Sequence, residues 1–494
     1  MSDTIPFSLK TKGTNLFYFL WAAVFIFLLY ILFTSTGTSD TGDGISHYMI
    51  SRFSFKHPEL FLDLWGKPLF TILSSPFSQF GLKGLTCFNI LCGMLSALCA
   101  FKIAKMMQLN YSWMVLFFTL FAPVYFGVIN SGLTEPLFSL ILTFSILKAF
   151  QGKHLSAAFI FSLAPFVRPE ANFIIPVFIF YFLVSKKFKA IPLLFAGTIL
   201  FTLIGWIHFG DILWLKNNSP YSAANGTKYG EVHGELFTYV RQYAHIIGQP
   251  QAVFFIAGCA FIAVFPFIQR MQLKTDSNNE GMHVNFFKEE FVLVYGSLFA
   301  CIAVHTFVWW KGIFPTLGLL RYISNVIPLA TLLSLRGLNF ILSYIKKDWI
   351  QDVVVIALIW FLCAVPFREY YFPFTLDSEL AVVKPGADWL LQSPYAKEKI
   401  YPTHPGAILF LDLDPFDGKQ MCTPAAVHAD NPGNGIPSKS IVFWDAHYGA
   451  HDNNLPIKVL LESPDYTLLK KFEPKDSFNV FGDTPFEVYI FQRK

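Results

Sequence analysis

The sequence predicts an α-helical polytopic membrane protein with about eleven transmembrane helices and a small extracytoplasmic C-terminal α/β domain. Of the 494 residues, 54% are hydrophobic and 14% are charged, whereas soluble domains carry about 25% charged residues. Phe alone contributes 57 residues, and the mean hydropathy is +0.48. This composition indicates that membrane lipids surround the chain, and it gives no reason to expect a nucleic-acid partner.

Apolar runs long enough to cross a bilayer recur along the chain up to Pro366. A spanning helix needs about 20 mostly apolar residues. The first run is too long for a cleaved signal peptide, and no small-residue cleavage site follows it directly. The candidate spans are Asn15–Phe33, Leu85–Phe101, Ser112–Ile129, Leu133–Leu147, Leu155–Phe166, Ala171–Val184, Ala190–Ile207, Gln251–Ile268, Phe291–Trp310, Thr316–Leu335 and Ile350–Pro366.

The distribution of Lys and Arg predicts the orientation. If the N-terminus is cytoplasmic, the cytoplasmic loops hold more Lys and Arg than the outer loops, which are longer in total. With an odd number of spans, the C-terminal domain is then extracytoplasmic. Residues 1–366 are therefore expected to form the transmembrane domain, and residues 367–494 the α/β domain. Residues 34–84 would form a long first outer loop, with short interfacial helices around His47–Phe55 and Pro58–Trp65.

The C-terminal part has the pattern of a small α/β domain. Short runs of β-forming residues alternate there with Pro and Gly turns. We expect strands at Ala407–Leu413, Ser440–Trp444 and Phe486–Gln492, and a helix at Ala387–Gln392.

In this topology, the charged residues next to the apolar runs gather at the outer face. Arg168-Pro169-Glu170 interrupts an almost continuous apolar stretch from Leu155 to Val184. An ionic pair at that depth is costly unless it lines a polar cavity. The other polar residues placed at this face are Asp40, Asp43, His47, Lys67, Glu135, Lys311 and Arg321. Such a group is what an outward-facing polar active site would produce.

Each residue of this group also has a structural interpretation. Asp43, between Gly42 and Gly44, suits a turn. Glu135 suits the positive end of a helix dipole. Arg168 and Glu170 could simply pair and hold a helix broken by proline. Lone cations such as Lys67 and Arg321 often anchor a helix at the membrane interface, and His47 and His305 suit structural roles. The joint pattern favours a functional site.

Several short motifs follow one another along the chain. Asp43-Gly44-Ile45-Ser46-His47-Tyr48 resembles the acidic-then-aromatic motif after the first span of the GT-C superfamily of membrane glycosyltransferases. Trp65-Gly66-Lys67-Pro68-Leu69 resembles an element of its dolichyl-phosphate-mannose and aminoarabinose transferase branch. Thr134-Glu135-Pro136-Leu137-Phe138 and Arg168-Pro169-Glu170 resemble elements of the mannosyltransferases that build GPI anchors. Arg321-Tyr322 with Pro328 resembles a late-span Arg-Tyr motif.

The resemblance covers most of residues 1–366 and implies a function. Enzymes of this superfamily use a catalytic Asp in the first outer loop and transfer a sugar from a polyprenyl-phosphate carrier. The implied activity is transfer of a sugar, with a mannose-like hexose favoured, to a glycan, lipid or protein acceptor at the extracytoplasmic face. Direct attack by the acceptor would invert the anomeric carbon.

This chemistry suggests a role for each candidate residue. A base takes the proton of the acceptor hydroxyl, and cations stabilise the leaving phosphate. Asp43 is the candidate base, with Asp40 and Glu135 as alternates. Lys67, Arg168 and Arg321 are the candidate phosphate ligands. The remaining candidates for substrate binding are Glu170, Tyr322, Tyr48 and His47.

The sequence departs from known motifs at two places, and two other functions are also consistent with it. Gly44 stands where the family has a second adjacent acidic residue, so a divalent metal is not supported and no cofactor is expected. Residues 443–449 superficially resemble an oligosaccharyltransferase motif, but the spacing differs. A lipid or sugar transporter or flippase is one alternative, although no internal repeat is visible. An O-antigen ligase or polymerase type enzyme is the other.

Overall fold

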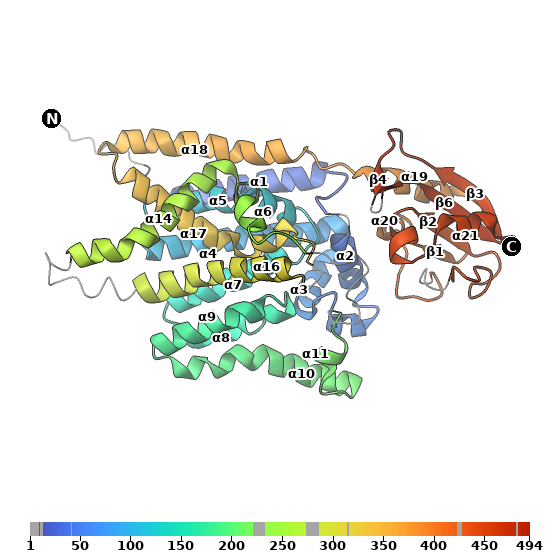
Figure 1. The fold of residues 1–494 in the computed structure, drawn as a ribbon, viewed down its shortest axis with the longest axis horizontal. Coiled ribbons are helices and arrows are strands. Elements are labelled where there is room, and N and C mark those ends of the chain that lie inside the picture. The colour runs from blue at the N-terminus through green and yellow to red at the C-terminus, as the bar shows by residue number, and fades with distance from the viewer. Residues whose placement is uncertain are drawn as a thin grey trace.

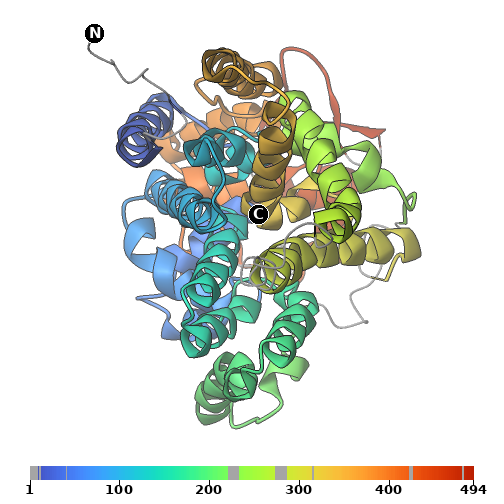
Figure 2. The ribbon, with the colours of Figure 1, turned by 90° about the vertical axis from the view of Figure 1, so that its left-hand side faces the viewer.

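The computed structural model describes residues 9, 13–40, 42–220, 233–272, 286–313, 316–421, 427–480 and 483–494. A bundle of roughly aligned helices makes up the chain to α18, and a mixed α/β domain lies beyond one end of this bundle (Figure 1). Viewed end on, the bundle carries α10 at one edge and α18 at the opposite edge (Figure 2).

Six helices in the described part of the chain are long and apolar enough to cross a membrane. They are α1 (Gly13–Thr34), α4 (Leu82–Met106), the segment Phe188–Phe209 that ends in α10 (Ala196–Phe209), Lys288–Lys311 with α16 (Ser297–Lys311), Leu320–Leu342 with α17 (Ile327–Leu342), and α18 (Asp348–Glu369). The chain is an integral membrane protein, as predicted from its composition.

The predicted number of about eleven spans is not confirmed, because the other candidates are bent or short. Ser112–Leu120 and Pro123–Ile129 meet at an angle of 72° and count as one span at most. Pro123 begins the second helix there, since its missing N–H cannot continue the first. The remaining apolar helices are His154–Phe166, α9 (Ala171–Val184), Gln249–Val264 within α14 (Gln249–Gln272), and α7 (Glu135–Phe150).

Burial separates the central helices from the peripheral ones. In α4 and in the span ending in α17, 72% and 78% of the most apolar window is buried, against 28% in α1 and α18. Large apolar side chains such as Phe19 and Trp360 stay exposed on the peripheral helices, where lipid would cover them. Residues that face the centre are therefore the ones able to form a protected site.

Small residues let α14 and α17 approach closely. A Cβ on Gly337 would collide with the carbonyl oxygen of Phe254, and one on Gly258 would collide with that of Leu333. Membrane helices commonly pack through such small residues, because apolar side chains gain little from leaving lipid. This contact fixes α17, whose N-terminal extension carries Arg321.

The first outer loop is mostly helical. It contains α2 (Asp43–Phe53), the short 3₁₀ helix η1 (Pro58–Leu62) and α3 (Pro68–Ser78). The hydroxyls of Ser51 and Ser74 lie 2.8 Å apart, as do those of Ser54 and Ser75, so paired hydroxyls join α2 to α3. The expected helices at His47–Phe55 and Pro58–Trp65 correspond to α2 and η1, whereas α3 was not predicted.

The C-terminal domain is built on a mixed four-stranded sheet. Its order is β1 (Ile400–Pro402), β2 (Ile441–Asp445), β6 (Val488–Arg493) and β3 (Tyr466–Phe472). Strand β1 is parallel to β2, and β6 is antiparallel to both β2 and β3. All five residues of β2 are buried, which marks it as the central strand of this domain. The other elements are α19 (Ser378–Gln392), α20 (Pro405–Phe410), the π-helical turn η10 (Tyr448–Asp452), α21 (Ile457–Glu462) and the hairpin β4–β5 (Asn479–Val480, Thr484–Pro485).

Two of the three expected strands are present, and one is wrong. The runs Ser440–Trp444 and Phe486–Gln492 correspond to β2 and β6. The predicted strand Ala407–Leu413 is replaced by helix α20, because Pro405 suits the first turn of a helix and the His404 ring accepts a hydrogen bond from Gly406 N–H. A short apolar run does not by itself distinguish a strand from a buried helix.

The C-terminal domain is joined to the first outer loop by ion pairs. Arg52 at the end of α2 lies 2.6 Å from Asp412. Lys56 and His57 lie 2.7 and 3.0 Å from Asp414, whose side chain is only 3% exposed. The domain therefore covers the end of the bundle at which α2 lies (Figure 1).

Candidate active site

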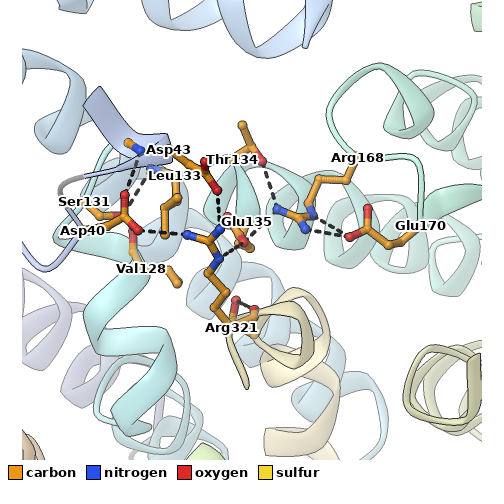
Figure 3. Close-up of polar contacts among 12 residues, drawn as sticks. Asp40, Asp43, Val128, Ser131, Leu133, Thr134, Glu135, Arg168, Glu170 and Arg321 are labelled. Atoms are coloured by element: carbon orange, nitrogen blue, oxygen red, sulfur yellow. Dashed lines mark hydrogen bonds and ion pairs between the residues drawn. The ribbon is translucent and has the colours of Figure 1, made fainter. Parts of the chain in front are cut away.

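Five charged side chains from distant parts of the sequence converge near the start of α2 (Figure 3), and α2 lies at the end of the bundle that faces the C-terminal domain (Figure 1). Asp40 and Asp43 come from the start of the first outer loop, and Glu135 is the first residue of α7. Arg168 lies at the apex between α8 (His154–Phe161) and α9, and Arg321 lies in the 3₁₀ helix η8 (Leu320–Val326). We call these five residues the ionic cluster.

Arg321 connects three carboxylates. Its Nη1 lies 2.9 Å from Oδ2 of Asp40, and its Nη2 donates a hydrogen bond to Asp43. Its Nε lies 3.9 Å from Oε1 of Glu135. One guanidinium thus occupies the position between the two aspartates at which a metal ion would have to bind. Within the described residues, no group of three or more His, Cys, Asp or Glu side chains is arranged to hold a metal.

Arg168 forms the second half of the ionic cluster. Its Nη1 lies 2.7 Å from Oε1 of Glu135 and donates to the hydroxyl of Thr134 at 3.1 Å. Its Nη2 and Nε donate to one oxygen of Glu170 at 2.6 and 3.1 Å. The local pairing of Arg168 with Glu170 that the sequence allowed is therefore present, but the same guanidinium also bonds to α7. Glu135, fully buried, lies between the two arginines.

The turn before α7 is fixed from a central helix. Asn89 of α4 donates from its amide nitrogen to the carbonyl oxygens of Ser131 and Leu133, at 2.8 and 2.7 Å. The Ser131 hydroxyl in turn accepts from the Leu133 N–H at 3.1 Å. Since Glu135 follows directly, these bonds position its carboxylate against the two arginines.

The same turn explains why Gly44 follows Asp43. A Cβ on Gly44 would lie 2.9 Å from Oδ1 of Asp40 and 3.1 Å from the backbone nitrogen of Gly132. The N–H of Gly44 donates to the same Asp40 oxygen at 2.7 Å. A second carboxylate adjacent to Asp43 would therefore have no room. Close backbone approach, rather than chemistry at position 44, accounts for this departure from the family motif.

Tyr322 lies against both arginines. The guanidinium carbons of Arg168 and Arg321 are 5.3 and 6.0 Å from the centre of its ring. The ring stacks on His305 with a centroid distance of 5.4 Å and an interplanar angle of 9°. A cation held over an aromatic face is favoured electrostatically. Tyr322 therefore helps to orient the two guanidinium groups, and His305 from α16 supports it.

Lys67 and His47 lie beside the ionic cluster in a buried position. Lys67 is 7% exposed, donates to the carbonyl oxygen of Leu64 at 3.0 Å and lies over the ring of Trp65 at 5.6 Å. Burial, and next the charge of Arg168, lower its pKa to about 8. His47 packs against Trp65 and Phe70, and its burial lowers its pKa to about 3. Lys67 is thus a cation that is poorly hydrated, while His47 is neutral.

Tyr48 points elsewhere. Its hydroxyl accepts a hydrogen bond from Nη1 of Arg52 at 2.9 Å, and Arg52 pairs with Asp412 of the C-terminal domain. The structure therefore brings together nine of the ten site residues that the sequence suggested, and it places Tyr48 in the contact between the domains. The contact between Thr134 and Arg168 was not predicted. The only feature of the sequence that could have pointed to it is the position of Thr134 directly before α7.

The carboxylates differ in exposure and electrostatic environment. The side chain of Asp43 is 38% exposed, that of Asp40 20%, and that of Glu135 is fully buried. Burial raises the pKa of Asp40 above its ordinary value, although the charge of Arg321 opposes this shift. Asp43 is therefore the carboxylate of the cluster that a substrate reaches most easily.

The bundle, the helical first outer loop and the C-terminal domain together have the GT-C fold that the sequence motifs led us to expect. A similar solved structure is that of ArnT from Cupriavidus metallidurans bound to undecaprenyl phosphate. It aligns with 97% of this chain and 98% of its own, with a TM-score of 0.58 and 10% sequence identity. No protein-family model and no curated protein sequence matches the chain. At this identity the likeness defines the fold and leaves the roles of individual residues to be argued from the site.

Proposed function

We propose that the chain is an integral-membrane glycosyltransferase of inverting mechanism. It moves a sugar from a polyprenyl-phosphate carrier to a hydroxyl group of an acceptor. The observation that carries this proposal is the pairing of Asp43, the most exposed carboxylate of the ionic cluster, with Arg321, within a GT-C fold. The similar ArnT structure contains undecaprenyl phosphate, which supports a polyprenyl-phosphate donor for this chain as well.

The cations of the site suit a lipid phosphate. Arg168 and Arg321 lie within ion-pair distance of a shared carboxylate, and Lys67 is buried beside them. Arginine forms strong, directional hydrogen bonds to phosphate, and buried cations stabilise a developing negative charge more than solvated ones. A donor phosphate would replace carboxylates as the hydrogen-bond partner of these guanidinium groups. Binding of the donor to Arg321 would thereby release the Asp43 carboxylate.

The released carboxylate is placed to act as a base. The acceptor oxygen forms a bond to the anomeric carbon while the bond from that carbon to the phosphate oxygen breaks. The acceptor proton passes to Asp43, and the polyprenyl phosphate leaves with both bonding electrons. Since the acceptor attacks opposite the leaving group, the anomeric carbon inverts. General base catalysis of this kind contributes about 10²–10⁴-fold in rate.

We also propose an orientation of the chain in the membrane and a class of sugar. The ionic cluster and the C-terminal domain lie at the same end of the bundle (Figure 1). We propose that this end lies outside and the N-terminus in the cytoplasm, and the distribution of Lys and Arg supports this orientation. A mannose-like hexose is our preferred sugar on the motifs around Glu135 and Arg168, and the acceptor is a glycan, lipid or protein.

The experiment uses the purified full chain in proteoliposomes with radiolabelled undecaprenyl-phosphate-linked sugars. A mannose, a glucose and an aminoarabinose donor are compared, and native membranes from cells deleted for this chain supply the acceptor. We expect release of undecaprenyl phosphate together with acceptor-bound label for one of the three donors, and we expect this donor to be the one that carries mannose. If none of the donors is consumed, and labelled sugar or lipid instead crosses the bilayer, the transporter interpretation replaces this one.

A matched control separates loss of chemistry from loss of folding. Arg336 and Glu290 form another buried ion pair, at 2.7 Å. Arg336 lies about 22 Å from Arg321 along the same span, at about 1.5 Å per residue. Glu290→Gln should therefore retain transfer, whereas Arg321→Ala should not.

A further inference from the structure

The C-terminal domain places one tyrosine against the loop that carries Asp43. A Cβ on Gly42 would lie 3.5 Å from the hydroxyl oxygen of Tyr448. Gly42 directly precedes Asp43, and Tyr448 follows strand β2, which ends at Asp445. Two residues separated by most of the chain therefore meet at the site, although the ion pairs that dock the domain lie further along α2.

A buried carboxylate fixes the backbone of this tyrosine. Oδ1 of Asp445 accepts from the N–H groups of His447 and Tyr448, at 3.0 and 2.8 Å. Its Oδ2 accepts from the hydroxyl of Thr403, and Asp445 is fully buried. A buried, fully bonded carboxylate holds a turn in one geometry. Tyr448 is thus rigidly placed and is not a residue of a loose surface loop.

Two histidines support the ring of Tyr448. The ring of His404 meets it edge-on at a centroid distance of 4.9 Å, and the ring of His447 lies at 4.4 Å. Glu379 of α19 joins the two histidines, with His404 Nε2 at 3.1 Å and His447 Nδ1 at 3.0 Å. Because His404 Nδ1 accepts from Gly406 N–H, the proton of this histidine lies on Nε2, which donates to Glu379.

The hydroxyl of Tyr448 is available as a donor. Burial, and next the charge of Glu379, raise the pKa of Tyr448, with Asp43 among the carboxylates that contribute. The phenol therefore keeps its proton at neutral pH. The side chain is partly exposed, and within the described residues its hydroxyl forms no hydrogen bond. A rigid, protonated hydroxyl without a protein partner is suited to bind an oxygen atom of a substrate.

The position of Tyr448 favours the acceptor over the donor phosphate. Asp43 and Asp40 lie on one side of Arg321, and Arg168 with Glu170 lies on the other (Figure 3). Lys67, a buried cation near Arg168, suits the phosphate, whereas Tyr448 approaches Gly42, the residue that precedes Asp43. The acceptor hydroxyl must approach Asp43, since that is where its proton goes.

We propose that the C-terminal domain completes the acceptor site through Tyr448, which donates a hydrogen bond to an oxygen of the hydroxyl-bearing acceptor. Glu379, with His404 and His447, acts as a positioning group for its ring. This inference rests on the proposed glycosyl transfer and adds a specificity-determining residue from outside the membrane domain. It follows that exchange of the C-terminal domain changes which acceptor is used.

The test compares Tyr448→Phe with Tyr466→Phe in the full chain. The Tyr466 hydroxyl donates to the carbonyl oxygen of Pro432 within the domain, so its removal is a matched loss of one hydroxyl. Proteoliposomes receive the labelled undecaprenyl-phosphate-linked sugar. Membranes from cells that lack this chain are added in increasing amounts as the acceptor. Two rates are measured: label transferred to those membranes, and label released to water when the membranes are omitted.

For Tyr448→Phe, we expect kcat/KM for the acceptor membranes to fall about tenfold, because one hydrogen bond is lost in the transition state. Release to water and binding of undecaprenyl phosphate stay at the level of the unsubstituted chain, since neither involves the acceptor. Tyr466→Phe leaves both rates unchanged. The inference is overturned if the two variants have the same kcat/KM at all membrane amounts while the unsubstituted chain is active. An unsubstituted chain that consumes no donor contradicts the proposed function itself.

Discussion

Nη1 of Arg321 lies 2.9 Å from Oδ2 of Asp40, although 281 positions separate these residues in the sequence. The same guanidinium bonds to Asp43 and approaches Glu135. A single cation therefore joins the start of the first outer loop to α7 and to a late membrane span. This arrangement makes Arg321 the residue on which both the geometry of Asp43 and the binding of a leaving phosphate depend.

Replacing Arg321 tests that dual dependence. In Arg321→Lys the charge stays but the fork that reaches two aspartates is lost. We expect transfer to fall by about 10²–10³-fold, the range found when one donor that stabilises developing charge is removed. Affinity for undecaprenyl phosphate, measured by tryptophan fluorescence, should weaken in parallel. Normal affinity together with normal transfer would show that the phosphate binds elsewhere.

Glu135 tests the stability of the ionic cluster. In Glu135→Gln, Arg168 loses a buried partner at 2.7 Å and Arg321 loses a neighbouring negative charge. Removing one member of a buried ion pair typically costs about 3–5 kcal/mol. We expect a clear drop in the thermal unfolding temperature in detergent. Glu290→Gln, which breaks the buried pair with Arg336, should give a drop of similar size but retain transfer activity.

The sequence allowed the membrane class and the GT-C fold to be predicted, because apolar runs and the order of short motifs are local features. It also indicated which charges share a face, since topology alone decides this for Asp40, Asp43, Glu135 and Arg168. The number of spans could not be predicted from local features alone. Proline at position 123 bends one candidate, and several others are shorter than a bilayer requires.

The contacts within the site could not be predicted from the sequence. Whether Glu170 pairs with Arg168 alone, or shares it with Glu135, depends on how α7 packs against the apex before α9. The approach of Tyr448 to Gly42 depends on docking of a separate domain. The expected strand at Ala407–Leu413 was wrong for a local reason, since periodicity in a short apolar run is ambiguous.

Docking of the C-terminal domain should depend on Asp414. Burial raises the pKa of this carboxyl, but hydrogen bonds from Lys56 and His57 outweigh it and hold the pKa below its ordinary value of 3.8. The contribution to docking is therefore present above about pH 4 and is lost as the pH falls below it. In Asp414→Asn, we expect the segment that links α18 to α19 to be cleaved faster by protease at neutral pH.

The control for this prediction is a surface pair of the same domain. Lys384 and Asp388 lie 2.6 Å apart on α19, and both are more than 40% exposed. Exposed pairs contribute little, so Asp388→Asn should leave protease sensitivity unchanged. Equal rates of cleavage in the two variants would mean that the contact through Asp414 does not hold the domains together.

The Glu379–His447 pair predicts a specific pH dependence. The hydrogen bond that His447 donates to Glu379 raises the pKa of His447 above 6.5, although burial opposes this shift. Burial raises the pKa of Glu379, but the bonds from His404 and His447 outweigh it and lower the pKa to about 2. Stabilisation by the pair is therefore complete between about pH 4.5 and 6.5. It decreases as the pH rises through the folded pKa of His447, and also as the pH falls towards 2.

Hydrogen exchange of peptides that contain β2 measures this effect. Protection should fall between pH 6.5 and 8.5 in the unsubstituted chain after correction for the intrinsic exchange rate. In His447→Gln, protection should be lower at pH 6 and nearly constant over the same range. A fall of the same size in both proteins would assign the pH dependence to another group.

The role of Asp43 as the base is tested most directly by measuring transfer by Asp43→Asn in proteoliposomes with labelled undecaprenyl-phosphate-linked sugar. Asparagine keeps the shape of the side chain but cannot take the acceptor proton. We predict that transfer falls by about 10²–10⁴-fold while undecaprenyl phosphate binds at least as well as before, because Arg168, Arg321 and Lys67 are intact and one competing carboxylate is removed. The assignment of Asp43 as the base would be contradicted by near-normal transfer in Asp43→Asn, with transfer abolished in Asp40→Asn or Glu135→Gln but retained in the destabilised control Glu290→Gln.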